Sequence, residues 1–314
     1  MPQIISQKPN QISLKAWAKI NLTLEVLKKR KDSFHEIRSI ITPIPLFDLI
    51  KVKLVFPKKN TTTAPPEPKI IITTNNKLLA REKKNNCYKA AQFITSRLPK
   101  NKIPASIKIH LEKNIPLAGG LGGSSADTAA VIIAFDKLFS LKLSKQEQLK
   151  ILARFSSEAA SLLPGVIITR GRGETAREIT QKPLKLPLVL ITFKDKLTTR
   201  DIFKNFNPPA GPKNRATISK KLAMTLKTAF KKTSRPKNLP GLISPFLLNH
   251  LELCPKINQT RLRLVKQRLK STGALNALMS GAGSTIYGIY PNNYTLKQAS
   301  NILKKHYSII ILPQ

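Results

Sequence analysis

Glycine and serine are concentrated in one short stretch, IPLAGGLGGSSADTAAV, which covers residues 115–131. An alternating segment at 105–116, typical of a strand, precedes it, and an apolar periodic run at 124–141, typical of a helix, follows it. Glycine allows positive φ and close approach to an anion, and the free N–H groups at a helix start favour negative charge. The stretch therefore predicts a phosphate-binding loop, with a tight turn and a serine N-cap as the structural alternative.

This loop differs from the two commonest nucleotide-binding loops. No Lys-Ser or Lys-Thr pair follows the glycines, so the segment is not a Walker A loop. The segment GLGGSS, which begins at residue 120, lacks the last glycine of the dinucleotide-binding fingerprint and has no acid at the required distance. The loop thus belongs to another class of phosphate site.

The charge of the chain is strongly positive: 55 Lys and Arg against 16 Asp and Glu give a net charge of +39. Such a charge predicts attraction to nucleic acid or to phosphorylated small molecules, unless the lysines merely cover solvated faces. The positive charge is spread along the chain without an RNA-binding aromatic motif or zinc-finger spacing, so a nucleic-acid partner is the weaker alternative. After Asp201 the only acidic side chain is Glu252, so acid–base chemistry must come mostly from the first 201 residues.

The compartment is indicated by what the sequence lacks. No apolar run is long enough for a membrane span, and the first residues lack the pattern of a secretory signal. The two cysteines, Cys87 and Cys254, are far apart and form no CxxC pair, which argues against a disulfide framework or a zinc site. We expect a cytoplasmic protein without a membrane partner.

The elements that must position the loop alternate between strands and helices without regular βαβ spacing, which predicts an α+β fold. Helices are expected over 85–98, 124–141, 144–156, 218–232 and 259–270. The strand-like LPLVLITF at 186–193 is expected to lie near the start of a second domain. We therefore predict domains over 1–180 and 181–314.

Three segments, in order, resemble the motifs of the GHMP kinases. They are AWAKINLTLEV (16–26), PLAGGLGGSSADTAA (116–130) and LMSGAGSTIYGIY (278–290). Further segments resemble the branch of that superfamily whose substrate carries a diphosphocytidyl group on methylerythritol, in the non-mevalonate route to isoprenoids: KDSFHEI, NNCYKAA, LEKNIP, GRGE and TTRDIF. The resemblance implies an ATP- and Mg²⁺-dependent small-molecule kinase. Its α+β fold would have two lobes, with the active-site cleft between them.

The resemblance also implies roles for individual residues. Lys19 would lie beside the acceptor hydroxyl and the transferring phosphate, where a cation stabilises charge on the phosphate oxygens. Asn21 would hydrogen-bond the acceptor, Phe34 and His35 would bind cytidine, Lys113 would face the substrate, and Asn85 would contact the nucleotide. The ATP phosphates would lie against Pro116, Leu117, Ala118, Gly119, Gly120, Leu121, Gly122, Gly123, Ser124, Ser125 and Ala126, with Ser125 as a candidate Mg²⁺ ligand. Gly281, Ala282, Gly283 and Ser284 would hold the loop and the substrate by close backbone approach.

One segment departs from the family pattern. The family carries a catalytic Asp in a GSDVPFF-like segment, whereas this chain has FSSEAASLLPG at 155–165. An ungapped count places Ser157 at the Asp position, and one deletion places Glu158 there. Glu158 is the candidate general base, while Asp127 is expected to serve capping, the helix dipole or Mg²⁺. Transfer without a formal base remains an alternative, because positioning and charge stabilisation carry most of phosphoryl transfer.

The sequence is also compatible with two other functions, and it does not fix the oligomeric state. One alternative is a GHMP kinase for another small alcohol, such as homoserine or mevalonate. A second is a catalytically impaired homologue that binds nucleotide or RNA through its basic surface. The chain is expected to be a monomer or a homodimer.

Overall fold

The structure is a computed structural model that describes residues 2–57, 67–76, 79, 84–156, 158–193, 198–208, 217–233 and 236–314. The chain forms two compact units that interleave along the sequence. Unit 1 comprises Met1–Ala18, Leu46–Ile115 and Gly122–Leu162, and unit 2 comprises Lys19–Pro45, Pro116–Leu121 and Leu163–Gln314. The division into domains at 180/181 stays a prediction.

Among its described residues, unit 1 combines strands with three helices. Its strands are β1 (Gln3–Lys8), the first part of β2 (Gln11–Lys29), the second part of β3 (His35–Val55), β4 (Lys69–Thr74) and β5 (Ser106–Glu112). Its helices are α1 (Asn86–Thr95), α2 (Gly123–Leu138) and α3 (Lys145–Ala153), with 3₁₀ turns at Lys100–Lys102 and Ala159–Leu162. β1 pairs antiparallel with β2, β5 pairs antiparallel with β3, and β4 pairs parallel with β5.

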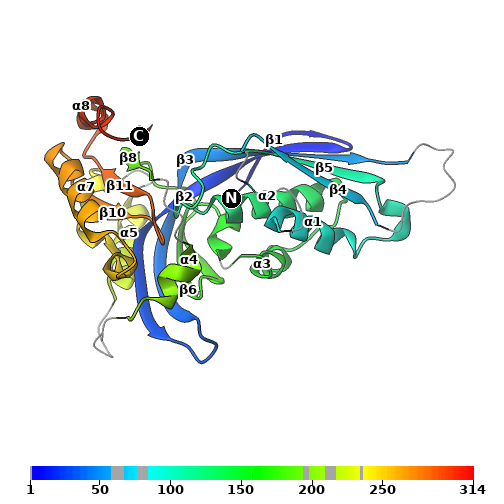
Figure 1. Ribbon diagram of the computed structural model, residues 1–314, viewed down its shortest axis with the longest axis horizontal. Helices are drawn as coiled ribbons and strands as arrows, with labels where there is room; N and C mark the ends of the chain where they lie inside the picture. Colours follow the sequence, from blue (N-terminus) through cyan, green and yellow to red (C-terminus); the bar gives the residue numbers. More distant parts are fainter. Residues whose placement is uncertain are drawn as a thin grey trace. The chain divides into compact units, whose positions relative to one another are not determined.

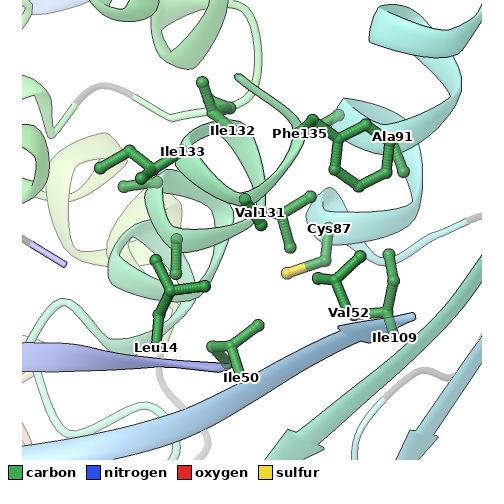
Figure 2. Close-up of a cluster of buried hydrophobic side chains, with 14 of the residues drawn as sticks. Leu14, Ile50, Val52, Cys87, Ala91, Ile109, Val131, Ile132, Ile133 and Phe135 are labelled. Carbon is green, nitrogen blue, oxygen red and sulfur yellow. The ribbon is translucent and has the colours of Figure 1, made fainter. Parts of the chain in front are cut away.

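The core of unit 1 lies between its strands and helices α1 and α2 (Figure 2). Leu14, Ile50, Val52 and Ile109 come from the strands and point toward Val131 of α2. Helix α2 is buried at every position from Ala126 to Asp136, as expected of a helix that is apolar on nearly all sides. Packing on this scale fixes the helix that follows the glycine loop.

The described part of unit 2 contains the remaining parts of β2 and β3, a four-stranded antiparallel sheet and five helices. Its other strands are β6 (Val166–Gly171), β7 (Thr175–Thr180), β8 (Leu188–Ile191), β9 (Leu248–Asn249), β10 (Asn276–Met279), β11 (Ile286–Ile289) and β12 (Ile309–Leu312). Its helices are α4 (Thr199–Lys204), α5 (Ile218–Lys232), α6 (Leu239–Ile243), α7 (Gln259–Ser271) and α8 (Asn293–Leu303), with 3₁₀ turns at Ser244–Phe246 and His250–Leu253. The four-stranded sheet has the order β10-β11-β8-β12, and α7 and α8 pack on one of its faces (Figure 1).

The expected α+β class is confirmed, because strand pairs are mostly antiparallel and the helices do not follow a regular βαβ rhythm. The five expected helices are present as α1, α2, α3, α5 and α7. The serine N-cap expected for α2 is wrong: the N-cap is Gly122, in the left-handed conformation, and no side chain caps this helix end. Among the described residues, no helix has both the length and the apolarity that a membrane crossing requires.

Candidate active site

The glycine loop turns through left-handed backbone conformations at every second residue. The φ angles of Ala118, Gly120 and Gly122 are 53°, 71° and 73°. A Cβ atom on Gly120 would lie 2.0 Å from the carbonyl oxygen of Ser280 and 2.9 Å from that of Gly283. Glycine is therefore required at position 120 both for its backbone angle and for this close approach.

The three sequence motifs meet at the carbonyl group of Gly120, within unit 2. This oxygen accepts hydrogen bonds from Lys19 Nζ at 2.9 Å and from Ser280 Oγ at 3.0 Å. The backbone N–H of Lys19 donates to the Leu121 carbonyl at 3.0 Å. The structure thus brings the lysine of the first motif, the loop and the third motif into direct contact.

Backbone hydrogen bonds join the third motif to the start of the loop. The N–H of Ser284 donates to the Ala118 carbonyl at 3.1 Å, and the N–H of Thr285 donates to the Gly119 carbonyl at 3.3 Å. Gly281 has a φ of +55°, and a Cβ atom there would lie 3.0 Å from the Gly120 carbonyl oxygen. The close approach expected of Gly281 is therefore present in the structure.

Asn249 is a residue of this cluster to which the sequence analysis gave no role. Its Nδ2 donates to the carbonyls of Met279 and Gly281, both at 2.8 Å, and so holds the turn of the third motif. Its segment, LLNHLE, precedes α7 in the chain, but no local pattern predicts a partner 30 residues away.

Asn21 lies beside Lys19 and uses both ends of its side-chain amide. Its Oδ1 accepts from Lys19 Nζ at 2.8 Å, and its Nδ2 donates to Ser39 Oγ at 2.8 Å. The Tyr287 hydroxyl donates to the Asn21 carbonyl at 2.8 Å. Asn21 therefore orients the lysine, and a hydrogen bond from it to an acceptor stays a prediction.

Phe34 directly precedes β3 and His35 is the first residue of that strand, and the two side chains differ in exposure. Phe34 is 49% exposed, with the Arg172 guanidinium 4.7 Å from its ring centre. His35 is buried, and its ring centre lies 5.5 Å from that of Phe203. Burial, followed by the charge of Lys29, lowers the pKa of His35, so the imidazole is neutral at pH 7. Its Nε2 is buried and has no hydrogen-bond partner within the described part of the chain.

Phe203 is a second residue without an assigned role in the sequence analysis. It lies on the short helix α4, within the TTRDIF segment, and its ring faces the imidazole of His35. The two residues are 168 positions apart, so only the fold brings the two rings together.

The second half of the loop and the start of α2 belong to unit 1. Ser124 and Ser125 lie in the first turn of α2, and Ser125 Oγ is 2.7 Å from Ser156 Oγ. The first helical hydrogen bond runs from Ala126 N–H to the Gly122 carbonyl at 2.9 Å. The preceding N–H groups of the helix start have no acceptor within the helix, which is the usual arrangement of an anion site.

The candidate general base lies in the segment after α3. The N–H of Glu158 donates to Ser156 Oγ at 3.1 Å, and the Glu158 side chain is partly buried. Ser157, the alternative at this position, lies outside the described residues. The choice between the two positions stays a prediction.

Asn85 and Lys113 are both engaged within unit 1. Asn85 is the N-cap of α1, and its Oδ1 accepts from Cys87 N–H at 2.8 Å. The Lys113 ammonium is buried between the carboxylates of Asp48 and Asp127, and its distance to Asp127 Oδ2 is 2.6 Å. The capping role expected of Asp127 is wrong, because its carboxylate forms this ion pair instead.

The electrostatics of this buried group follow from two carboxylates sharing one cation. Burial raises the pKa of Asp127 to about 8; Lys113 opposes this shift, and Asp48 adds to it. Burial lowers the pKa of Lys113, but the charges of Asp127 and Asp48 raise it by more, so that the ammonium stays protonated.

Comparison with known proteins identifies two matching domain families. The model of the GHMP kinases N terminal domain matches residues 85–166, and that of the GHMP kinases C terminal domain matches residues 229–309. Both matches include segments that form the cluster around Gly120.

Curated relatives extend this similarity over nearly the whole chain. The chain is 32% identical over 303 residues to 4-diphosphocytidyl-2-C-methyl-D-erythritol kinase of Caldanaerobacter subterraneus, covering 96% of each protein. It is 30% identical over 300 residues to the protein of the same name from Caldicellulosiruptor saccharolyticus, covering 95% of each. Among solved structures, 4-(cytidine 5'-diphospho)-2C-methyl-D-erythritol kinase has a TM-score of 0.70 at 22% identity, covering 96% of this chain and 98% of the other.

Proposed function

Because the chain belongs to the GHMP kinases, a family of ATP-dependent small-molecule kinases, we propose that it phosphorylates 4-diphosphocytidyl-2-C-methyl-D-erythritol. The γ-phosphoryl group of ATP would pass to the 2-hydroxyl of this alcohol, the proton of that hydroxyl would be lost, and ADP would leave. The observation that carries the proposal is the convergence of three motifs on the Gly120 carbonyl, in a chain similar along its length to relatives of one name.

The phosphates of ATP are assigned to the loop from Pro116 to Ala126. The left-handed turns at Gly120 and Gly122 let the backbone come close to an anion, and the first N–H groups of α2 are available as donors. Asn85 is kept as a proposed nucleotide contact at the start of α1.

Lys19 is the proposed electrostatic catalyst. Its ammonium is held by Asn21 Oδ1 and the Gly120 carbonyl, so its position does not depend on the substrate. A fixed cation beside a transferring phosphoryl group stabilises the negative charge on the equatorial oxygens without reorganising during the reaction.

The Mg²⁺ expected with ATP would supply charge neutralisation on the phosphate oxygens. The Ser125 and Ser156 hydroxyls, which are hydrogen-bonded to each other at 2.7 Å, offer oxygen atoms of the kind that a hard cation binds. Asp127 does not join these two hydroxyls, because its carboxylate is committed to Lys113. We propose Ser125 as the protein ligand.

The cytidine group is assigned to the surroundings of His35. A neutral imidazole with a buried Nε2 suits a hydrogen bond to a nucleobase, and the ring of Phe203 adds an aromatic face beside it. Phe34, which is half exposed, offers a second face for stacking. Lys113 is left out of the substrate-binding set because its ammonium is buried on two carboxylates.

The test of the function follows ADP release with purified protein, ATP, Mg²⁺ and one acceptor at a time. We expect turnover with 4-diphosphocytidyl-2-C-methyl-D-erythritol and none with homoserine or mevalonate. Turnover only with one of the other two alcohols would replace the proposed acceptor while leaving the kinase assignment in place.

Glu158→Gln tests the general base. If Glu158 accepts the hydroxyl proton, kcat falls by about 10²–10⁴-fold, because the variant loses the base but keeps the shape of the side chain. A rate equal to that of the unmodified protein would exclude Glu158 and favour transfer without a carboxylate base.

Three further properties complete the proposal. We place the protein in the cytoplasm, as a monomer or homodimer that acts on a small-molecule substrate, with nucleic-acid binding kept as the weaker alternative. Both cysteines are buried free thiols, which suits a reducing compartment.

A further inference from the structure

Asp48 lies outside all the glycine-motif segments, yet its carboxylate is fully buried and makes contacts on both oxygens. Its Oδ1 accepts from the N–H groups of Asn114 and Ile115, at 2.6 and 2.8 Å. Its Oδ2 binds the Lys113 ammonium. One carboxylate thus holds three consecutive residues immediately before the glycine loop.

The same lysine reaches the chain on the other side of the loop. Lys113 Nζ binds Asp127 Oδ2 on α2 at 2.6 Å, and the side-chain exposures of Lys113 and Asp127 are 2% and 4%. A Cβ atom built on Gly123 would lie 3.4 Å from Lys113 Nζ and 3.2 Å from Ile115 Cγ2. The segment entering the loop and the first turns of α2 are therefore packed together, and all of these contacts lie within unit 1.

We propose that Asp48, Lys113 and Asp127 form a carboxylate clamp that positions the two ends of the glycine loop for nucleotide binding. Asp48 is then a positioning residue, which acts on the nucleotide through the backbone of 114–115 and through Lys113. This inference rests on the proposed function, because the ligand it serves is ATP.

The physical basis is the cost of an unpaired buried charge. An ammonium at this depth is stable only while carboxylates compensate it, so the lysine holds both chain segments at a fixed separation. Loss of the Asp48 carboxylate leaves the lysine under-compensated and frees residues 114–115, whereas loss of the Asp127 side chain removes the oxygen that ties the ammonium to α2. Loop residues positioned by a rigid frame bind their ligand without an ordering cost.

Asp48→Asn is the main test, since the amide keeps the shape but places donors against the Lys113 ammonium. We expect the affinity for ADP, measured by isothermal titration calorimetry, to fall roughly tenfold or more. The amide hydrogens of residues 114, 115 and 123–127 should exchange faster than in the unmodified protein. In turnover assays the KM for ATP should rise by a larger factor than kcat falls.

Asp136→Asn is the matched control, because Asp136 is also a buried carboxylate on α2 but binds Leu143 N–H, at 2.8 Å, at the far end of the helix. The clamp is overturned if Asp48→Asn and Asp136→Asn have the same ADP affinity and the same exchange at 114–127. If Asp48→Asn does not fold, Asp127→Asn gives the same decision, because it releases the α2 side of the clamp.

The test separates the clamp from the proposed function. ADP affinity and amide exchange require no acceptor, so a wrong acceptor leaves both readouts intact. The clamp alone would be refuted if the protein phosphorylates the proposed acceptor while neither Asp48→Asn nor Asp127→Asn changes ADP affinity or amide exchange in the loop.

Discussion

The Lys19 ammonium, the Gly120 carbonyl and the Asn21 amide form the smallest unit of the proposed chemistry. Two neutral oxygens, at 2.9 and 2.8 Å, hold the ammonium in one place. A cation that is already held in place before the reaction can stabilise the charge of a transferring phosphoryl group without reorganising.

Replacement of this lysine tests the arrangement. Lys19→Met should lower kcat by roughly 10²–10³-fold, the effect of removing one preorganised electrostatic donor. Steady-state kinetics with the proposed acceptor measure this loss. Lys51→Met, an exposed lysine on β3, is the control and should retain the activity of the unmodified protein. A comparable rate for both variants would remove Lys19 from the chemistry.

The protonation of Asp127 makes the stability of the folded chain depend on pH. Its pKa is raised to about 8, chiefly by burial, in surroundings that include Lys113, Asp48 and the Cys87 thiol. Between about pH 4 and pH 8 the folded chain therefore holds a proton that the unfolded chain has lost, so stability falls as pH rises through this window.

Asp127→Asn removes that proton linkage. The free energy of unfolding of the variant, relative to the unmodified protein, should rise between pH 5 and pH 8, by at most about 1.4 kcal/mol per pH unit. Urea denaturation at several pH values measures the difference. Thr128→Val, on the same helix and without a titratable group, should show a constant difference. A constant difference for Asp127→Asn as well would refute the raised pKa.

At the scale of elements, the glycine loop is a rigid turn rather than a flexible linker. Third-motif N–H groups bind the carbonyls of Ala118 and Gly119, and α2 begins directly after Gly122. The one strained position is Ala118, a residue with a Cβ atom at a φ of 53°.

Ala118→Gly should relieve this strain. An alanine in the left-handed conformation destabilises the folded chain by about 1–2 kcal/mol, and glycine removes this cost. Glycine also has more conformational freedom in the unfolded chain, which destabilises the folded state by about 0.5–1 kcal/mol. We expect a gain of about 0.5–1 kcal/mol in the free energy of unfolding, measured by urea denaturation. Ala126→Gly, inside α2, should instead lose about 1 kcal/mol. Destabilisation in both variants would show that the loop does not strain Ala118.

At the scale of the whole molecule, the net charge of +39 suits a protein whose proposed ligands are both anionic. Positive charge spread over the surface accelerates their encounter, while contacts inside a site are screened less by salt. Encounter and turnover should therefore respond differently to ionic strength.

Salt titration separates steering from nucleic-acid binding. Raising NaCl from 0.1 M to 1 M shortens the screening length from about 10 Å to about 3 Å, so kcat/KM should fall while kcat changes little. Binding of a fluorescent single-stranded RNA should be lost much more steeply. RNA binding that survives 0.5 M salt would instead support the nucleic-acid alternative.

Local sequence patterns predicted the helices and strands and pointed to the glycine loop as a candidate phosphate site. The strand before Pro116, the left-handed glycines and the apolar run of α2 are local patterns, whose physical meaning depends on residues a few positions apart. The predicted helices and the α+β class followed from such patterns. The serine N-cap was wrong because a left-handed Gly122 ends the loop just as well, and sequence spacing does not distinguish the two.

Which distant residues lie together depends on the folded chain. Asn249 with Gly281, Phe203 with His35, and Asp48 with Lys113 are pairs separated by 32 to 168 positions. Buried polar and charged groups must find partners when the chain folds, but the sequence shows only that such groups exist. Which carboxylate compensates Lys113, and which amide holds the third motif, depends on strands and helices that meet only in the folded chain.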